Sequence, residues 1–143
     1  MNVVEAPMHP AWVRLVEDDD PSPALAQEVA AVLSDCHERD LLVVAHLDRL
    51  GRLGALLGVV RGLLAHGGPG FWEVVATHAF SEWLDGDVVT AHEDAARVLA
   101  AVPGHSLAQL VCLACEAGMA PEALRPGLLA AGDEAARACA RLQ

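Results

Sequence analysis

A pair of cysteines, Cys112 and Cys115, has the C-x-x-C spacing that redox and zinc chemistry use. A structural zinc site needs four ligands and usually two such pairs, whereas Cys36 and Cys139 stand alone in the sequence. A thioredoxin-type site needs its first cysteine at the N-terminus of a helix that follows a strand. Because this pair falls in the middle of a predicted helix, we interpret both residues as small packing residues. On a helical wheel, Cys115 lies near the apolar side and Cys112 on the opposite side.

A second group of candidate ligands consists of His78, Glu82 and His92. His78 and Glu82 are one helical turn apart, and His92 lies beside Glu93 and Asp94 in the next predicted helix. Imidazole and carboxylate groups from two helices could hold a metal ion, but the Glu-x-x-His spacing of di-metal bundle proteins is absent. His78 and Glu82 point away from the side of their helix that carries the tryptophans. We therefore expect them to face solvent or a neighbouring helix.

The remaining motifs lack the partners that chemistry would need. Ser106 has no nucleophile-elbow sequence around it and is predicted to cap a helix. The glycine-rich residues 66–70 lack the Lys-Ser/Thr of a phosphate-binding loop, and the acidic run 17–20 lacks EF-hand spacing. We predict no catalytic residue, no cofactor-binding residue and no metal site. The candidates kept for an alternative function are His78, Glu82, His92, Cys112 and Cys115.

The helices that would position these residues are clearest between residues 71 and 118. A helix over Phe71–Leu84 carries an apolar stripe with two tryptophans and ends at Gly86, which we expect in a left-handed conformation. A second helix over Val88–Ala101 ends at a Pro-Gly pair, and a third begins after Ser106 and ends at Gly118. Connections this short predict that the three helices are antiparallel neighbours.

The N-terminal half shows more varied signals. Residues 1–21 are predicted to be an extended acidic lead-in, and Ser22-Pro23 begins a helix. A second apolar helix is expected over Leu41–Leu50, followed by Gly54, Gly58 and Gly62 at four-residue intervals. This series predicts either a break or kink near Gly51–Gly54, which we favour, or close packing on a neighbour within the chain or in a homodimer. Arginines interrupt the run, so it is far shorter than the ~20 residues that span a membrane.

The fold class that these signals predict is all-α. We expect an antiparallel bundle of six to seven helices, with residues 22–143 forming a single domain and the loop at 66–70 joining two sub-bundles. Pro121 should begin a short helix, and the last helix should run from Glu134 to Leu142.

Two resemblances to known families lie in the C-terminal half. Gly86, Ala91 and Pro103 have the spacing of a tetratricopeptide-like helix pair, which implies stacked hairpins. A further resemblance rests on Gly86-Asp87, Ala95-Ala96, Pro103 with Ser106-Leu107-Ala108-Gln109-Leu110, Ala117-Gly118 and Pro121-Glu122. With Arg39-Asp40, this pattern over residues 35–126 resembles an uncharacterised actinobacterial family, domain of unknown function 4192. Members are usually longer, so this chain resembles their C-terminal helical half. The family has no assigned activity and therefore implies no site residues.

Composition and charge limit the partners. The 143 residues include no lysine, isoleucine or tyrosine, which is typical of a GC-rich genome, and the net charge is −11. Nucleic-acid binding needs clustered cations, so we expect no nucleic-acid ligand. Isolated cysteines and the lack of a signal peptide at the start favour a cytoplasmic location.

The leading hypothesis for function is a non-catalytic module for protein interaction or self-association, with a homodimer expected. Its basis is the absence of a complete site together with an apolar content of 54%, which favours an interface. The alternative is a small enzyme or a metal- or ligand-binding domain with a site between helices. A weaker alternative is an acidic decoy that occupies the nucleic-acid site of a basic protein.

Overall fold

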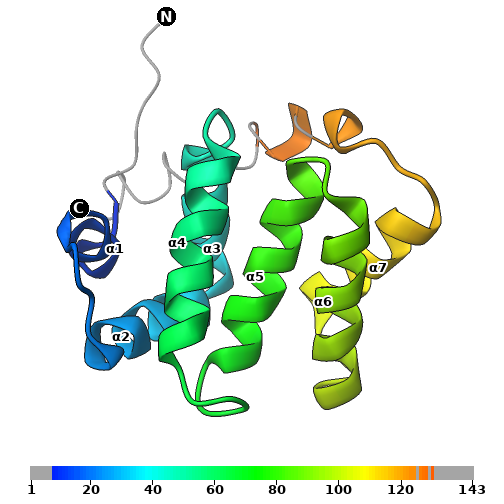
Figure 1. The fold of residues 1–143 in the computed structure, drawn as a ribbon. Coiled ribbons are helices and arrows are strands. Elements are labelled where there is room, and N and C mark those ends of the chain that lie inside the picture. Colours follow the sequence, from blue (N-terminus) through cyan, green and yellow to red (C-terminus); the bar gives the residue numbers. More distant parts are fainter. Residues whose placement is uncertain (1–7, 125, 129, 131–143) are drawn as a thin grey trace, which may run out of the picture.

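The fold is all-α in the part of the chain that the computed structural model describes, which is residues 8–124, 126–128 and 130 (Figure 1). No strand occurs among these residues. The helices are α1 (Pro10–Glu17), α2 (Pro23–Leu33), α3 (Cys36–Ala45), α4 (Leu50–Leu63), α5 (Phe71–Leu84), α6 (Val88–Ala101), α7 (Ser106–Glu116) and the short 3-10 helix η1 (Pro121–Ala123). The predicted helix over Glu134–Leu142 lies outside the described residues.

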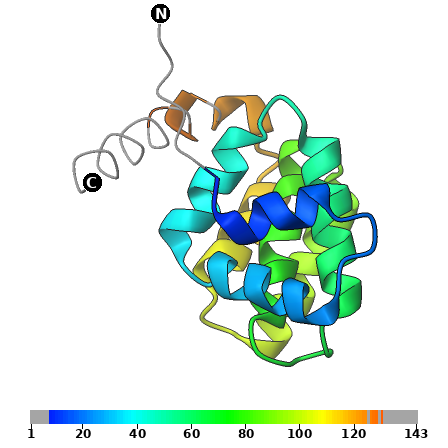
Figure 2. The same ribbon diagram turned by 90° about the vertical axis from the view of Figure 1, so that its left-hand side faces the viewer.

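Helix α5 is the central element of the fold. It packs against α4 on one side, against α6 and α7 on the other, and also against α2. Ten of its fourteen residues are buried, which is typical of a helix surrounded by other helices. Figure 1 shows α4, α5 and α6 side by side, and Figure 2 shows α1 and α2 covering one side of this layer.

The helix ends follow from side-chain caps and glycines. Asp87 accepts a hydrogen bond from the backbone N–H of Thr90 at the start of α6, and Gly86 has the predicted positive φ of 91°. Gly70, with φ 75°, is the N-cap of α5, and a Cβ atom at this position would lie only 2.8 Å from Cβ of Ala30. Glycine therefore lets the N-terminus of α5 approach α2 closely.

Three expectations about local structure are wrong. Residues 10–17 of the expected extended lead-in form α1, because Ala11, Trp12 and Leu15 share a face that is buried in the core. The cap of α7 is His105, whose Nδ1 accepts from the backbone N–H of Ala108; Ser106 is the first helical residue.

The third concerns the glycine series. The chain breaks at residues 46–49, between α3 and α4, and α4 then continues without interruption through Gly51, Gly54, Gly58 and Gly62. The other interpretation of the series, close packing on a neighbour, fits Gly54 and Gly58, whose nearest neighbours are side chains of α5. Among the described residues, no helix is long and apolar enough to cross a membrane.

Candidate functional site

His78 and Glu82 meet a third polar residue, Asp94, in the seam between α5 and α6. One ligand atom from each of these residues lies within 4.8 Å of the other two. His78 and Glu82 are half-buried and Asp94 is buried. We call His78, Glu82 and Asp94 the polar cluster.

Helix α4 packs on the other side of α5 and approaches His78 from there. Cβ atoms placed on Gly54 and Gly58 would lie 3.9 Å from Nε2 and 3.7 Å from Cε1 of His78. These are ordinary van der Waals distances, so an alanine would also fit at either position, and α4 packs on the side of α5 that carries the imidazole ring.

Two arginines fix the carboxylate of Asp94. Arg61 of α4 donates from Nη1 and Nη2 to its two oxygens at 3.0 and 3.1 Å, and Arg97 donates to Oδ1 at 3.0 Å. Only 4% of the Asp94 side chain is exposed. Bidentate pairing of this kind is strong and directional, so the Asp94 carboxylate has a defined orientation toward α5.

The other two members of the cluster have polar atoms without partners. Nδ1 of His78 and Oε1 of Glu82 are buried, with no hydrogen-bond partner among the described residues. If Glu82 were ionised, its carboxylate would face the carboxylate of Asp94, and two hydrogen-bond acceptors cannot bond to each other. A protonated Glu82 instead donates a hydrogen bond to Asp94. Buried polar atoms without partners are rare in folded proteins and often mark sites of function.

The protonation states follow from this environment. Burial, followed by the hydrogen bond with Asp94 and its negative charge, raises the pKa of Glu82 to about 8. Burial also lowers the pKa of His78, with the charge of Arg61 acting in the same direction. For Asp94, burial works to raise the pKa, but hydrogen bonds from Arg61 and Glu82 outweigh it and the pKa is lowered. At neutral pH the cluster therefore holds a neutral imidazole, a carboxylic acid and a carboxylate.

Comparison with known families supplies an identity but no chemistry. Residues 4–122 match the family described as "Domain of unknown function (DUF4192)". The chain belongs to this family. The match extends beyond the resemblance over residues 35–126 toward the N-terminus and includes α1 and α2. No curated protein and no solved structure matches the chain.

Not all of the candidate ligands of this DUF4192 chain come together. His92 lies away from the polar cluster and pairs with Glu116 of α7, with 3.3 Å between Nε2 and Oε1. The side chain of His92 is 41% exposed. His92 therefore forms a surface pair, and Asp94, two residues further along α6, takes the position facing α5.

Among the described residues, no further candidate ligand joins the cysteine pair. Cys112 is buried at 8% exposure, so its expected position on the side opposite the apolar face is wrong. Sγ of Cys115 lies 3.7 Å from the carbonyl oxygen of Val88. Burial raises the pKa of both thiols, which disfavours the thiolate that metal binding and redox chemistry require.

Two residues at the candidate site, Asp94 and Arg61, are not among the predicted site residues, although the sequence carries a signal for both. Asp94 falls on the apolar stripe of α6 that Ala91, Ala95 and Val98 form. Arg61 comes one helical turn after the buried Leu57 of α4. A charged residue on a buried stripe requires a partner of opposite charge, so the sequence indicates that each residue is paired, but not with which residue.

Proposed function

We propose that this chain is a small helical domain that binds a divalent metal ion, such as Zn²⁺, at the polar cluster. The proposal takes up the alternative function, a site between helices, in preference to the non-catalytic interaction module. The observation that carries it is the convergence of one imidazole and two carboxylates from two helices within 4.8 Å. Zinc and similar divalent ions are bound in proteins by these groups.

Asp94 is suited to be a ligand even though it is paired with arginine. A carboxylate offers about four lone-pair positions. Arg61 and Arg97 occupy three of them, and the hydrogen bond from Glu82 is lost when an ion replaces the Glu82 proton. Arg61 and Arg97 would then act as outer partners that orient the ligating carboxylate, as is usual around metal sites.

Glu82 and His78 supply the other two donors. Oε1 and Nδ1 are buried without partners, and a metal ion would satisfy both. The ion would replace the proton that Glu82 holds at neutral pH, since its pKa is raised to about 8. Three protein donors leave a fourth tetrahedral position for water or another small ligand. We assign binding to this site and no reaction.

The proposal is tested by titrating chelator-treated protein with Zn²⁺ in a calorimeter at pH 7. We expect one ion per chain and release of about one proton per ion, because Glu82 must ionise to bind. The test variants are His78→Ala and Glu82→Gln, each expected to weaken binding at least ~10-fold. Glutamine has the shape of the protonated glutamic acid, so Glu82→Gln preserves the metal-free structure.

The matched control is His92→Ala, which removes an exposed histidine on the facing helix without touching the cluster. Its affinity for Zn²⁺ should equal that of the wild type. The proposal is wrong if the wild type does not bind, or if Glu82→Gln and His92→Ala bind equally well.

Self-association of the chain stays a prediction, and so does the tetratricopeptide-like stacking of its helix pairs. The observation that favours it is that α6 and α7 expose large apolar side chains, with Val89 71% and Leu113 64% exposed. Sedimentation of the wild type and a Val89→Ser/Leu113→Ser variant tests it. A dimer that the double substitution converts to a monomer would support self-association, and a monomeric wild type at micromolar concentration would count against it.

A further inference from the structure

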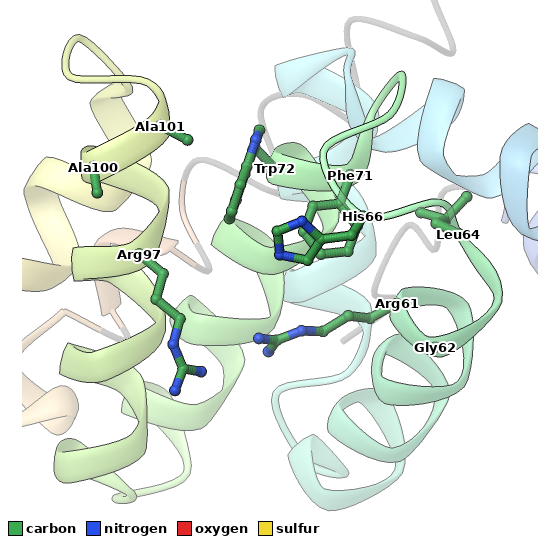
Figure 3. A pocket seen from close by; sticks show the side chains of 9 residues that line it. All are labelled: Arg61, Gly62, Leu64, His66, Phe71, Trp72, Arg97, Ala100 and Ala101. Carbon is green, nitrogen blue, oxygen red and sulfur yellow. The ribbon is translucent and has the colours of Figure 1, made fainter.

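A cleft lies beside the polar cluster, between the C-terminal half of α4, the N-terminus of α5 and the C-terminal half of α6. Its volume is about 740 Å³, which is in the range of clefts that bind small organic molecules. The residues that line it are Arg61, Gly62, Leu64, His66, Phe71, Trp72, Arg97, Ala100 and Ala101 (Figure 3). We call it the arginine cleft.

The cleft concentrates positive charge on an otherwise acidic chain. Two of the nine basic residues line it in a protein of net charge −11. Their guanidinium groups approach each other from facing helices (Figure 3). They share one carboxylate, that of Asp94. Two cations facing one anion leave an excess of positive charge in the cleft.

Arg97 can bind a ligand while it stays hydrogen-bonded to Asp94. Its side chain is 61% exposed, and only Nη1 is bonded to Asp94. The remaining guanidinium nitrogens have no partner among the described residues. A planar guanidinium with free N–H groups binds phosphate and carboxylate oxygens in a fixed geometry.

The upper part of the cleft in Figure 3 is aromatic. The ring of His66 lies 4.8 Å from that of Phe71 and 5.5 Å from that of Trp72, measured between centroids. Trp72 is half-buried, and its ring stands at the cleft beside Ala100 and Ala101. Half-covered aromatic rings offer a flat apolar surface on which a planar ring stacks.

We infer that the arginine cleft binds a small phosphorylated compound with a flat ring, of the size and chemistry of a mononucleotide. The phosphate would lie between Arg61 and Arg97, and the ring would stack on Trp72 or His66. Phosphate fits better than carboxylate because a third oxygen remains for the second of two guanidinium groups on separate helices. None of the three donors of the polar cluster lines the cleft, so AMP binding can be measured without a metal ion, although Arg61 and Arg97 also contact Asp94.

Tryptophan fluorescence measures the binding, with AMP as the probe and EDTA present. Trp12 and Trp83 are buried at 2% and 1% exposure, so the change on binding should come from Trp72 and vanish in Trp72→Leu. Arg97→Gln should weaken AMP binding about tenfold or more, which is the loss of one charge-assisted contact. Arg14→Gln is the matched control, because Arg14 is another exposed arginine with one acidic partner.

Comparing the affinities of adenosine, inorganic phosphate and benzoate with that of AMP shows which part of the ligand each half of the cleft binds. Adenosine and phosphate should each bind at least ~10-fold more weakly than AMP, since each meets only one half of the cleft. The inference is overturned if AMP causes no change in fluorescence, if Arg97→Gln and Arg14→Gln bind AMP equally, or if benzoate binds more tightly than AMP. A loss of zinc binding with AMP binding intact would overturn only the metal site, and the reverse would overturn only this inference.

Discussion

His78 with Glu82 on α5 and Cys112 with Cys115 on α7 are both pairs of candidate ligands one helical turn apart, yet their surroundings differ completely. The first pair faces a carboxylate and two arginines from neighbouring helices. The second pair has no such partner among the described residues: one thiol is in the core and the other is near a backbone carbonyl oxygen. The spacing of candidate ligands along one helix is therefore weak evidence for a site. The residue on the facing helix determines whether the pair is part of a larger polar cluster.

The largest effect is expected at that facing residue. Asp94→Asn removes the negative charge that two arginines share and should reduce the free energy of unfolding by about 2–3 kcal/mol. This is below the cost of breaking a fully buried ion pair, because 25% of the Arg61 side chain and 61% of the Arg97 side chain are exposed. Denaturation in urea measures the loss, with the exposed Glu93→Gln on the same helix as control. Equal stability of the two variants would show that Asp94 does not hold the seam together.

A smaller, pH-dependent effect is expected for Glu82→Gln in the metal-free protein. The pKa of Glu82 is about 8 in the folded chain and 4.5 ordinarily, so between these values the folded state keeps a proton that the unfolded chain releases. The stability linked to this proton is complete below about pH 4.5 and is lost as the pH rises through 8. Comparison with Glu82→Gln isolates this group from His78, whose lowered pKa acts in the opposite direction.

The measurement is the free energy of unfolding of both proteins at pH 5 and at pH 8.5. The wild type should lose about 1–2 kcal/mol relative to Glu82→Gln between these values, since half-burial and coupling reduce the full effect of the shift. A constant difference between the two proteins across this range would mean that Glu82 is ionised throughout, as an exposed carboxylate would be.

The contrast between the two pairs also shows what the sequence could and could not predict. The bounds of α5 and α6 were predicted because apolar periodicity and the Gly86-Asp87 turn are local signals. The predicted break is in the wrong place because helix propensity alone disfavours the glycine series, whereas α4 continues as one helix through these glycines, with side chains of α5 next to Gly54 and Gly58. To predict the polar cluster, one must know which residues of α5 lie opposite which residues of α6. Side-chain packing determines this register, and no local sequence pattern encodes it.

A modest gain in stability is expected for Gly58→Ala. The new Cβ atom would lie 3.7 Å from Cε1 of His78, an ordinary van der Waals contact, and alanine favours the helix by about 0.5–1 kcal/mol over glycine. Thermal denaturation measures the gain, and zinc affinity should not change. A loss of stability would show that α4 packs more tightly on the imidazole than this distance indicates.

The smallest effect is expected for Cys115→Ala on the contrasting pair. Cys115 is half-buried at the edge of the core, and its Sγ lies 3.7 Å from the carbonyl oxygen of Val88, so the free energy of unfolding should change by less than about 0.5 kcal/mol. Calorimetric titration with Zn²⁺ should give the same affinity as the wild type. If Cys115→Ala binds zinc more weakly than the wild type, the metal site lies at α7 and not between α5 and α6.

The position of the bound ion is the most direct test of the polar cluster. Crystals grown with equimolar Zn²⁺ should give one anomalous difference peak at the zinc absorption edge, ~2.0–2.2 Å from a ring nitrogen of His78 and from carboxylate oxygens of Glu82 and Asp94. A peak at His92 and Glu116, at Cys112 and Cys115, or no peak in the seam between α5 and α6 would contradict the account.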